Sequence, residues 1–177
     1  MSEFRAERDP QSLRDFQQAL IDRLSSPTAG DSAQSSRLAL LAGGEHWLLR
    51  LDEAQEVVPP APITAVPLAK AWYLGLSRVR GNLFSIIDFG AFVGGARGQQ
   101  GAESRFVVLS ERFRLSAALL VDRVVGLRSI ADLQRIDPID AQAPWASGLY
   151  QANDGIRWRE ISISALAQSS EFLQTGR

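Results

Sequence analysis

Apolar and polar positions alternate with a period of two at the start of the chain's main body. Two short apolar runs, 37–42 and 45–51, flank the pair Gly43-Gly44. An alternating pattern is typical of a strand with one buried face, and paired glycines supply the positive φ angles of a tight turn. This segment is therefore predicted to form a β-hairpin.

The same kind of pattern returns several times toward the C-terminus. Further short apolar runs, separated by turn residues, lie at 83–87 (LFSII), 105–110 (RFVVLS), 115–127 (LSAALLVDRVVGL), 149–154 (LYQAND) and 156–161 (IRWREI). The last two flank Asp154-Gly155 and predict a second hairpin. Roughly eight to ten short strands with few helices favour β-barrels or a sandwich over a parallel α/β sheet.

Two segments interrupt this pattern. Residues 52–67 contain prolines at 59, 60, 62 and 67, which exclude a central strand and predict an irregular or edge segment. Residues 94–103 (GGARGQQGAE) are rich in glycine and polar side chains, and we expect them to form an exposed connector between two halves of the body.

Three segments read as helical. Residues 10–24 have an apolar face at Leu13, Phe16, Leu20 and Leu24, with Asp9 as N-cap, and a small polar linker follows at 28–36. This helix either packs back on the body or docks on a partner. Asp88 is predicted to cap a short helical turn over FGAFVGG. Residues 162–173 are predicted to form a final short helix with Ser162 or Ser164 as cap. The domain boundaries follow as 1–36 for helix and linker and 37–177 for the body.

Composition excludes several classes of function. The net charge of −1 and pI of about 5.9 leave no basic surplus for nucleic acid. The chain has no cysteine, which excludes disulfides, thiolate metal sites and thiol nucleophiles. Neither a signal peptide nor an apolar run long enough to span a membrane is present in the sequence, so we expect a cytoplasmic protein that is not membrane-inserted.

Catalytic and metal-binding constellations are not recognisable. His46 is the single histidine, and a Ser-His-Asp triad would have to use it beside a hairpin turn. The glycines of 94–101 match neither a dinucleotide-binding fingerprint nor a P-loop. Carboxylates adjacent in sequence, such as Asp52 and Glu53, point opposite ways on a strand and are poor candidates for paired acid-base chemistry. No metal site and no catalytic residue are predicted.

The segment WYLGLSRVRGNLFSIIDFGAFVG (72–94) carries the most information. It resembles the signature of the CheW family, the coupling proteins of bacterial chemotaxis arrays, at Leu74-Gly75, Val79-Arg80-Gly81, Ile86-Ile87-Asp88 and Phe92-Val93-Gly94. ALLVDRVVGLRSI (118–130) and AQEV with Glu56 are also similar to family segments. The resemblance covers about residues 37–173. The preceding helix and the end ALAQSSEFL are similar to the branch that serves type IV pili and twitching motility.

This resemblance implies a fold and a function. The fold is mainly β: two packed five-stranded SH3-like barrels, here with an N-terminal amphipathic helix and a short C-terminal helix. The function is a non-catalytic adaptor without cofactor. Its implied partners are the cytoplasmic tip of a methyl-accepting receptor and the regulatory domain of a CheA-type histidine kinase. The adaptor would then reach membrane receptor arrays through these partners.

The resemblance also implies binding residues: Arg80, Gly81, Val79, Glu56 and Ala54. Arg80 can pair bidentately with a carboxylate or with helix carbonyls of a receptor. Gly81 provides positive φ or close approach of a partner. Val79 is either a core residue or an apolar contact, and Glu56 either orients Arg80 or pairs with a partner arginine. Ala54 is smaller than the aliphatic residue often found at its position in the family.

Other residues near these motifs are interpreted as structural. Ser85 stands where many family members have proline, which frees a backbone N–H. Asp122 and Arg123 are expected to form a local pair. The four tryptophans are expected in the core, with Trp72 as a possible rim contact.

Three alternatives remain open from the sequence. The first is an SH3-like or OB-like domain with another ligand such as nucleic acid. The second is a serine hydrolase using His46. The third is a family adaptor with flagellar rather than pilus output.

Overall fold

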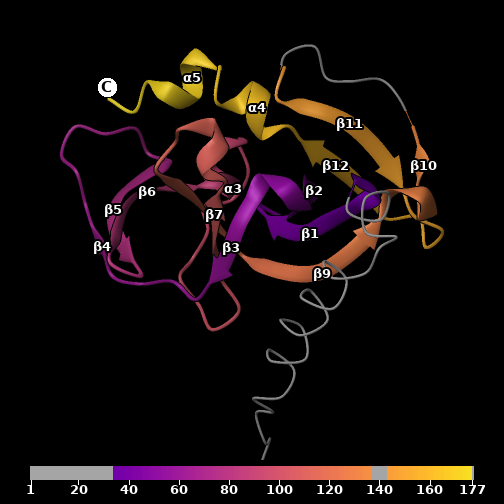
Figure 1. Cartoon of the computed structure of the whole chain (residues 1–177), viewed down its shortest axis with the longest axis horizontal. Helices are drawn as coiled ribbons and strands as arrows, with labels where there is room; N and C mark the ends of the chain where they lie inside the picture. The colour runs from indigo at the N-terminus through magenta and orange to yellow at the C-terminus, as the bar shows by residue number, and fades with distance from the viewer. Residues whose placement is uncertain (1–33, 137–142, 177) are drawn as a thin grey trace, which may run out of the picture. The chain divides into compact units, whose positions relative to one another are not determined.

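Two curled β-sheets make up the body of the chain in a computed structural model that describes residues 34–136 and 143–176 (Figure 1). Sheet A contains, in order across the sheet, β10 (Gln134–Arg135), β11 (Ala146–Gln151), β12 (Arg157–Ile161), β2 (Glu45–Arg50), β1 (Ser36–Ala42) and β9 (Arg123–Ser129). Sheet B contains β3 (Ala54–Val58), β7 (Arg105–Leu109), β8 (Ala117–Val121), β6 (Asn82–Asp88), β5 (Tyr73–Val79) and β4 (Ile63–Thr64). The predicted helix at 10–24 lies outside the described residues.

Short helical elements connect and follow the strands. They are η1 (Leu51–Glu53), α3 (Phe89–Phe92), η2 (Glu111–Phe113), η3 (Ile130–Asp132), α4 (Ile163–Leu166) and α5 (Ser170–Leu173). The prediction of one C-terminal helix over 162–173 is therefore wrong in detail, because the helix is broken between Leu166 and Ser170. Ser162 caps α4, with its Oγ accepting from the Ala165 N–H at 3.2 Å.

Both predicted hairpins are confirmed, and the fold is mainly β as expected. β1 pairs with β2 across Gly43-Gly44, and β11 pairs with β12 around Asp154-Gly155. The proline-rich segment forms β3 and β4, which are the two edges of sheet B. Each sheet has six strands rather than the five predicted, and each includes one strand of only two residues, β4 in sheet B and β10 in sheet A.

The chain builds sheet A from both ends of its body and sheet B from the middle. It passes from β2 to β3 through η1, and returns from β8 to β9 through Asp122. The loop at 94–103 joins α3 to β7, and the strands on either side of it, β6 and β7, both belong to sheet B. The prediction that this loop connects the two halves is therefore wrong, because the halves are not consecutive in sequence.

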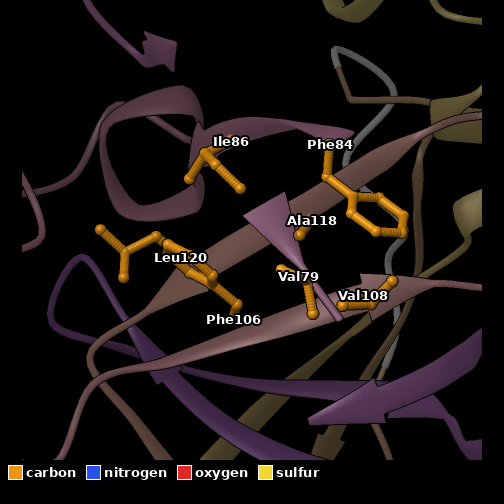
Figure 2. Packing of buried hydrophobic residues seen from close by; sticks show 7 residues of the cluster. All are labelled: Val79, Phe84, Ile86, Phe106, Val108, Ala118 and Leu120. Atoms are coloured by element: carbon orange, nitrogen blue, oxygen red, sulfur yellow. The ribbon is translucent and has the colours of Figure 1, made fainter. Parts of the chain in front are cut away.

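Sheet B curls around its own apolar core. The buried side chains are Val79, Phe84, Ile86, Phe106, Val108, Ala118 and Leu120, which Figure 2 shows converging on one interior. Val58 of β3 and Ile63 of β4 also pack against this cluster, although their strands are the opposite edges of the sheet. A flat sheet would hold these edges far apart, so their common contact shows that the sheet rolls into an SH3-like barrel.

An aromatic cluster links elements of the two sheets. Trp47 of β2 lies edge-on to Phe89 of α3 at 5.0 Å between ring centroids. Trp145 lies 5.6 Å from Phe92, and Phe92 lies 5.1 Å from Trp72. The four tryptophans are all buried, at 8 % exposure or less, which confirms their place in the core. Trp72, suspected of a rim contact, stacks on Phe172 of α5 at 6.3 Å.

Candidate functional site

The hairpin of β5 and β6 carries the central residue of the predicted site at its tip. Val79 and Asn82 are the last paired residues, so Arg80 and Gly81 form a two-residue turn. Their φ angles are +48° and +88°, and positive φ at both central residues is what a type I′ hairpin turn requires. Gly81 adopts such a backbone easily, whereas an arginine there costs about 1 kcal/mol or more.

Arg80 projects from this turn and pairs with Glu56. The Arg80 Nε lies 2.6 Å from the Glu56 Oε2, and the two side chains are 71 % and 22 % exposed. Glu56 lies on β3, at the far edge of sheet B from β4 and β5, so the pair forms only because the sheet rolls up. The expectation that Glu56 orients Arg80 agrees with this geometry. Most of the Arg80 side chain therefore remains accessible to a partner.

The other predicted site residues lie around this pair in different ways. Val79 is 5 % exposed and packs in the barrel interior, so it anchors the turn from beneath. Ala54 begins β3 opposite Leu109 and is half-buried. A register shift leaves Gln55 unpaired between Ala54 and Glu56, and such a bulge changes the direction of the strand's side chains. Ala54 is therefore near Glu56 in the strand without being part of the ion pair.

Charged residues next to β3 form a network that the sequence did not reveal. Asp52 Oδ2 lies 2.8 Å from Arg112 Nη1, and Asp52 Oδ1 lies 3.1 Å from Arg50 Nε. The hydrogen bond from Arg50, with help from Arg112, lowers the pKa of Asp52 to about 2. Glu53 beside it is buried, and this burial raises its pKa. Arg112 lies 60 residues from Asp52 in the chain, which is why sequence reasoning missed the cluster.

Asp88 caps α3, as predicted, and also accepts a hydrogen bond from the loop at 94–103, which was not predicted. Its Oδ1 accepts from the Ala91 N–H at 3.0 Å, and its Oδ2 accepts from the Gly98 N–H at 3.0 Å. The side chain is fully buried and ties the glycine-rich loop to the helix. The Gly98 N–H therefore already donates a hydrogen bond to a buried carboxylate of the same chain.

Asp122 and Arg123 do not form the local pair that was expected. The Asp122 carboxylate accepts from the Gly43 N–H at 3.0 Å, which fastens the β8–β9 connection to the β1–β2 turn. Arg123 instead lies 3.9 Å from Glu103. Residues adjacent on a strand or at its end point to opposite sides, so two neighbours seldom pair with each other.

Ser85 uses the backbone N–H that a proline would lack. This N–H donates to the Ser116 carbonyl at 2.8 Å, beside the parallel pairing of β6 with β8. The Ser85 hydroxyl also lies 3.1 Å from the Tyr73 hydroxyl. The departure from proline therefore adds contacts to the hairpin that presents Arg80.

Two exposed side chains of the hairpin were not singled out from the sequence. Arg78 is exposed, and Leu83, directly opposite it across the two strands, is 52 % exposed. The available signal for Arg78 was the alternation itself, since a buried Val79 places the preceding strand residue on the outer face.

Candidates for other chemistry find no support among the described residues. His46 packs edge-on against Trp158 at 4.8 Å between ring centroids. Within residues 34–136 and 143–176, no three His, Asp or Glu side chains are grouped so that they could hold a metal ion. In the same part of the chain, no helix has the length and apolar character needed to cross a membrane.

Comparison with known proteins gives one consistent family. The model of the CheW-like domain matches residues 38–171. The protein PilI of Pseudomonas aeruginosa is 28 % identical over 83 % of this chain and 84 % of its own length. The chemotaxis protein CheW of Helicobacter pylori is 24 % identical over 68 % of this chain and 74 % of its own. These matches confirm the resemblance to the family and to its PilI branch.

A solved structure supports the fold independently. The scaffolding protein TtCheW from Thermoanaerobacter tengcongensis superposes with a TM-score of 0.61 at 19 % identity, covering 73 % of this chain and 89 % of its own. The two-barrel prediction is thereby confirmed. With three quarters of its length matched by the family's domain, the chain belongs to the CheW family and is a scaffold protein rather than an enzyme.

Proposed function

We propose that this chain couples methyl-accepting receptors to a CheA-type histidine kinase in a system that controls type IV pili and twitching motility. It acts at the cytoplasmic side of receptor arrays, which it reaches through its partners. The likeness to PilI supports the pilus output over a flagellar one. Arg80, with Gly81 and Glu56, contacts the receptor, while Val79 and Ala54 support that surface.

This proposal rests on the backbone conformation, exposure and ion pair of Arg80. A left-handed backbone at a residue other than glycine or asparagine costs roughly 1–2 kcal/mol, which the surrounding structure must offset. Here the arginine stands at a hairpin tip, is 71 % exposed and is steered by one carboxylate at 2.6 Å. A turn chosen for stability alone would have asparagine or glycine at this position.

The chemistry of the group suits a reversible contact. A guanidinium presents several N–H donors in one plane and pairs with carboxylates in two-point fashion. The Glu56 pair occupies only part of this fork. A receptor carboxylate or helix carbonyl can therefore bind the remaining donors. Each contact of this kind contributes a modest binding free energy. An array raises the overall affinity because it holds many copies together.

The test is binding of the purified chain to two soluble fragments, a receptor signalling tip and the regulatory domain of a CheA-type kinase. Wild type, Arg80→Glu and Arg114→Glu are compared by isothermal titration calorimetry. Arg114 is the matched control, because it is also an exposed arginine with positive φ, +54°, in a loop of the same sheet.

We expect wild type and Arg114→Glu to bind both fragments. Arg80→Glu should keep kinase binding and lose receptor affinity on the order of 100-fold, since removing a buried interface charge pair costs roughly 2–5 kcal/mol. Equal receptor affinity of wild type and Arg80→Glu would refute the role of Arg80. Failure of the folded wild-type chain to bind either fragment would refute the coupling function.

A further inference from the structure

The outer face and the tip of the β5–β6 hairpin carry two exposed arginines and an exposed leucine. We propose that Arg78, Arg80 and Leu83 form a docking face for a partner helix with two carboxylates one turn apart beside an apolar residue. This inference rests on the proposed function, because it specifies the receptor chemistry that the Arg80 site recognises.

Strand register puts Arg78 and Leu83 on one face of the hairpin, next to the turn that carries Arg80. Ser77 and Phe84 are paired and buried, so they point into the barrel. The next pair is Arg78 with Leu83, and alternation directs both outward. Arg80 lies at the tip of the same hairpin, in the two-residue turn that follows Val79. Cross-strand neighbours lie roughly 5 Å apart, so Leu83 is adjacent to Arg78.

Leu83 is unusual for the strand that carries it. Phe84 and Ile86, on the inner face of the same strand, are 8 % and 0 % exposed, whereas Leu83 is 52 % exposed. On the outer face of β6 this side chain is open to contact by a partner. Burying such a leucine removes apolar area from water and stabilises a complex.

The charge of this face selects an acidic partner. Among the described residues, Arg78 has no acidic partner, and Arg80 pairs with a single carboxylate, that of Glu56. Two guanidinium groups against one carboxylate leave the face positive, on a chain with net charge −1. A complementary segment must therefore bring negative charge as well as an apolar group.

Spacing indicates the form of the partner. Arg78 is in β5 and Arg80 is the first residue of the turn that follows it, so their Cα atoms lie at most about 7 Å apart, the reach of two residues of extended chain. Carboxylates at positions i and i+4 of an α-helix are about 6 Å apart along its axis. A helix laid along β5 can thus pair one carboxylate with each arginine, while an apolar residue of the same face covers Leu83.

The experiment measures binding of the receptor signalling-tip fragment at low and high salt. The variants are Arg78→Glu and Leu83→Thr, which keeps strand propensity. Their controls are Arg157→Glu, an exposed strand arginine of sheet A, and Leu173→Thr, whose leucine is also 52 % exposed. Thermal unfolding shows that each variant is folded.

Arg78→Glu should weaken binding about 10-fold or more and flatten its salt dependence, because one charge pair is lost. Leu83→Thr should weaken it about 5-fold to 10-fold with the salt dependence unchanged. The two controls should stay within about twofold of wild type.

Three other outcomes overturn the inference. If only Arg80→Glu weakens binding, the proposed function stands and the docking face is reduced to one residue. If Leu83→Thr changes self-association, measured by sedimentation, and leaves receptor affinity intact, the face is a contact between copies. If the wild-type chain does not bind the fragment, the proposed function fails with it.

Discussion

At the scale of single residues, Arg80 combines an unfavourable backbone with an exposed charge. Its φ of +48° belongs to the left-handed region, which asparagine and glycine enter at little cost and β-branched residues avoid. Arg78, two residues earlier, is in the regular strand, where β-branched residues are favoured. The two arginines should therefore respond in opposite ways to the same replacements.

We expect Arg80→Asn to have a free energy of unfolding about 1 kcal/mol higher than Arg80→Val. At position 78 the order should reverse, with Arg78→Val more stable than Arg78→Asn by a few tenths of a kcal/mol. Urea denaturation of the four variants measures both differences. The same order at both positions would contradict the left-handed turn.

At the scale of elements, the pairing of β4 with β5 depends on a missing side chain. Gly75 has a φ of +132°, and a Cβ there would lie 2.0 Å from the Thr64 carbonyl oxygen and 2.9 Å from the Ala65 Cα. The Leu74-Gly75 motif was recognised by resemblance alone. Its physical reason is this close approach of two backbones, which a register shift between Tyr73 and Gly75 accompanies.

Gly75→Ala should lower the free energy of unfolding by roughly 2–4 kcal/mol, because backbone must move away from the new methyl group. Gly81→Ala is the matched control. Its φ of +88° is also positive, but a Cβ there meets no atom within 4 Å, so about 1 kcal/mol should be lost. Chemical denaturation compares the two, and equal losses would rule out the steric explanation.

At the scale of the whole molecule, Glu53 lies where the chain passes from sheet A to sheet B. Its Oε2 accepts from the Ile163 N–H of α4 at 3.3 Å, and its Oε1 lies 3.8 Å from Arg112. The side chain is 5 % exposed. Burial raises its pKa, and the hydrogen bond from Ile163 and the charge of Arg112 oppose that shift without cancelling it.

A carboxyl group with a raised pKa in the folded state favours folding at low pH, and this contribution disappears as the pH rises through the folded-state pKa. Glu53→Gln stays neutral and can still accept from Ile163. We therefore expect the stability of Glu53→Gln relative to wild type to increase as the pH rises from 4 to 7. Denaturation at several pH values measures this trend.

Glu103→Gln is the control for this trend, since Glu103 is 72 % exposed. Its stability relative to wild type should show little change over the same range. A relative stability of Glu53→Gln that falls with pH would mean that Arg112 and the hydrogen bond outweigh burial.

The sequence predicted those parts of the molecule that depend on neighbouring residues. Gly43-Gly44 and Asp154-Gly155 mark two hairpins, and Asp88 marks a helix cap, because turn and cap chemistry acts within a few residues. The position of Arg80 in the site came from the resemblance. Its two-residue turn with Gly81 and the burial of Val79 were seen only in the structure.

Tertiary structure decided everything that joins distant segments. It brought Glu56 to Arg80, Arg112 to Asp52 and Gly98 to Asp88. It also built sheet A from both ends of the body, so that the loop at 94–103 stays within sheet B. The physical reason is that hairpins and caps are stabilised by local backbone preferences, whereas Arg112 reaches Asp52 only when β3 pairs with β7, and Glu56 reaches Arg80 only when sheet B rolls up.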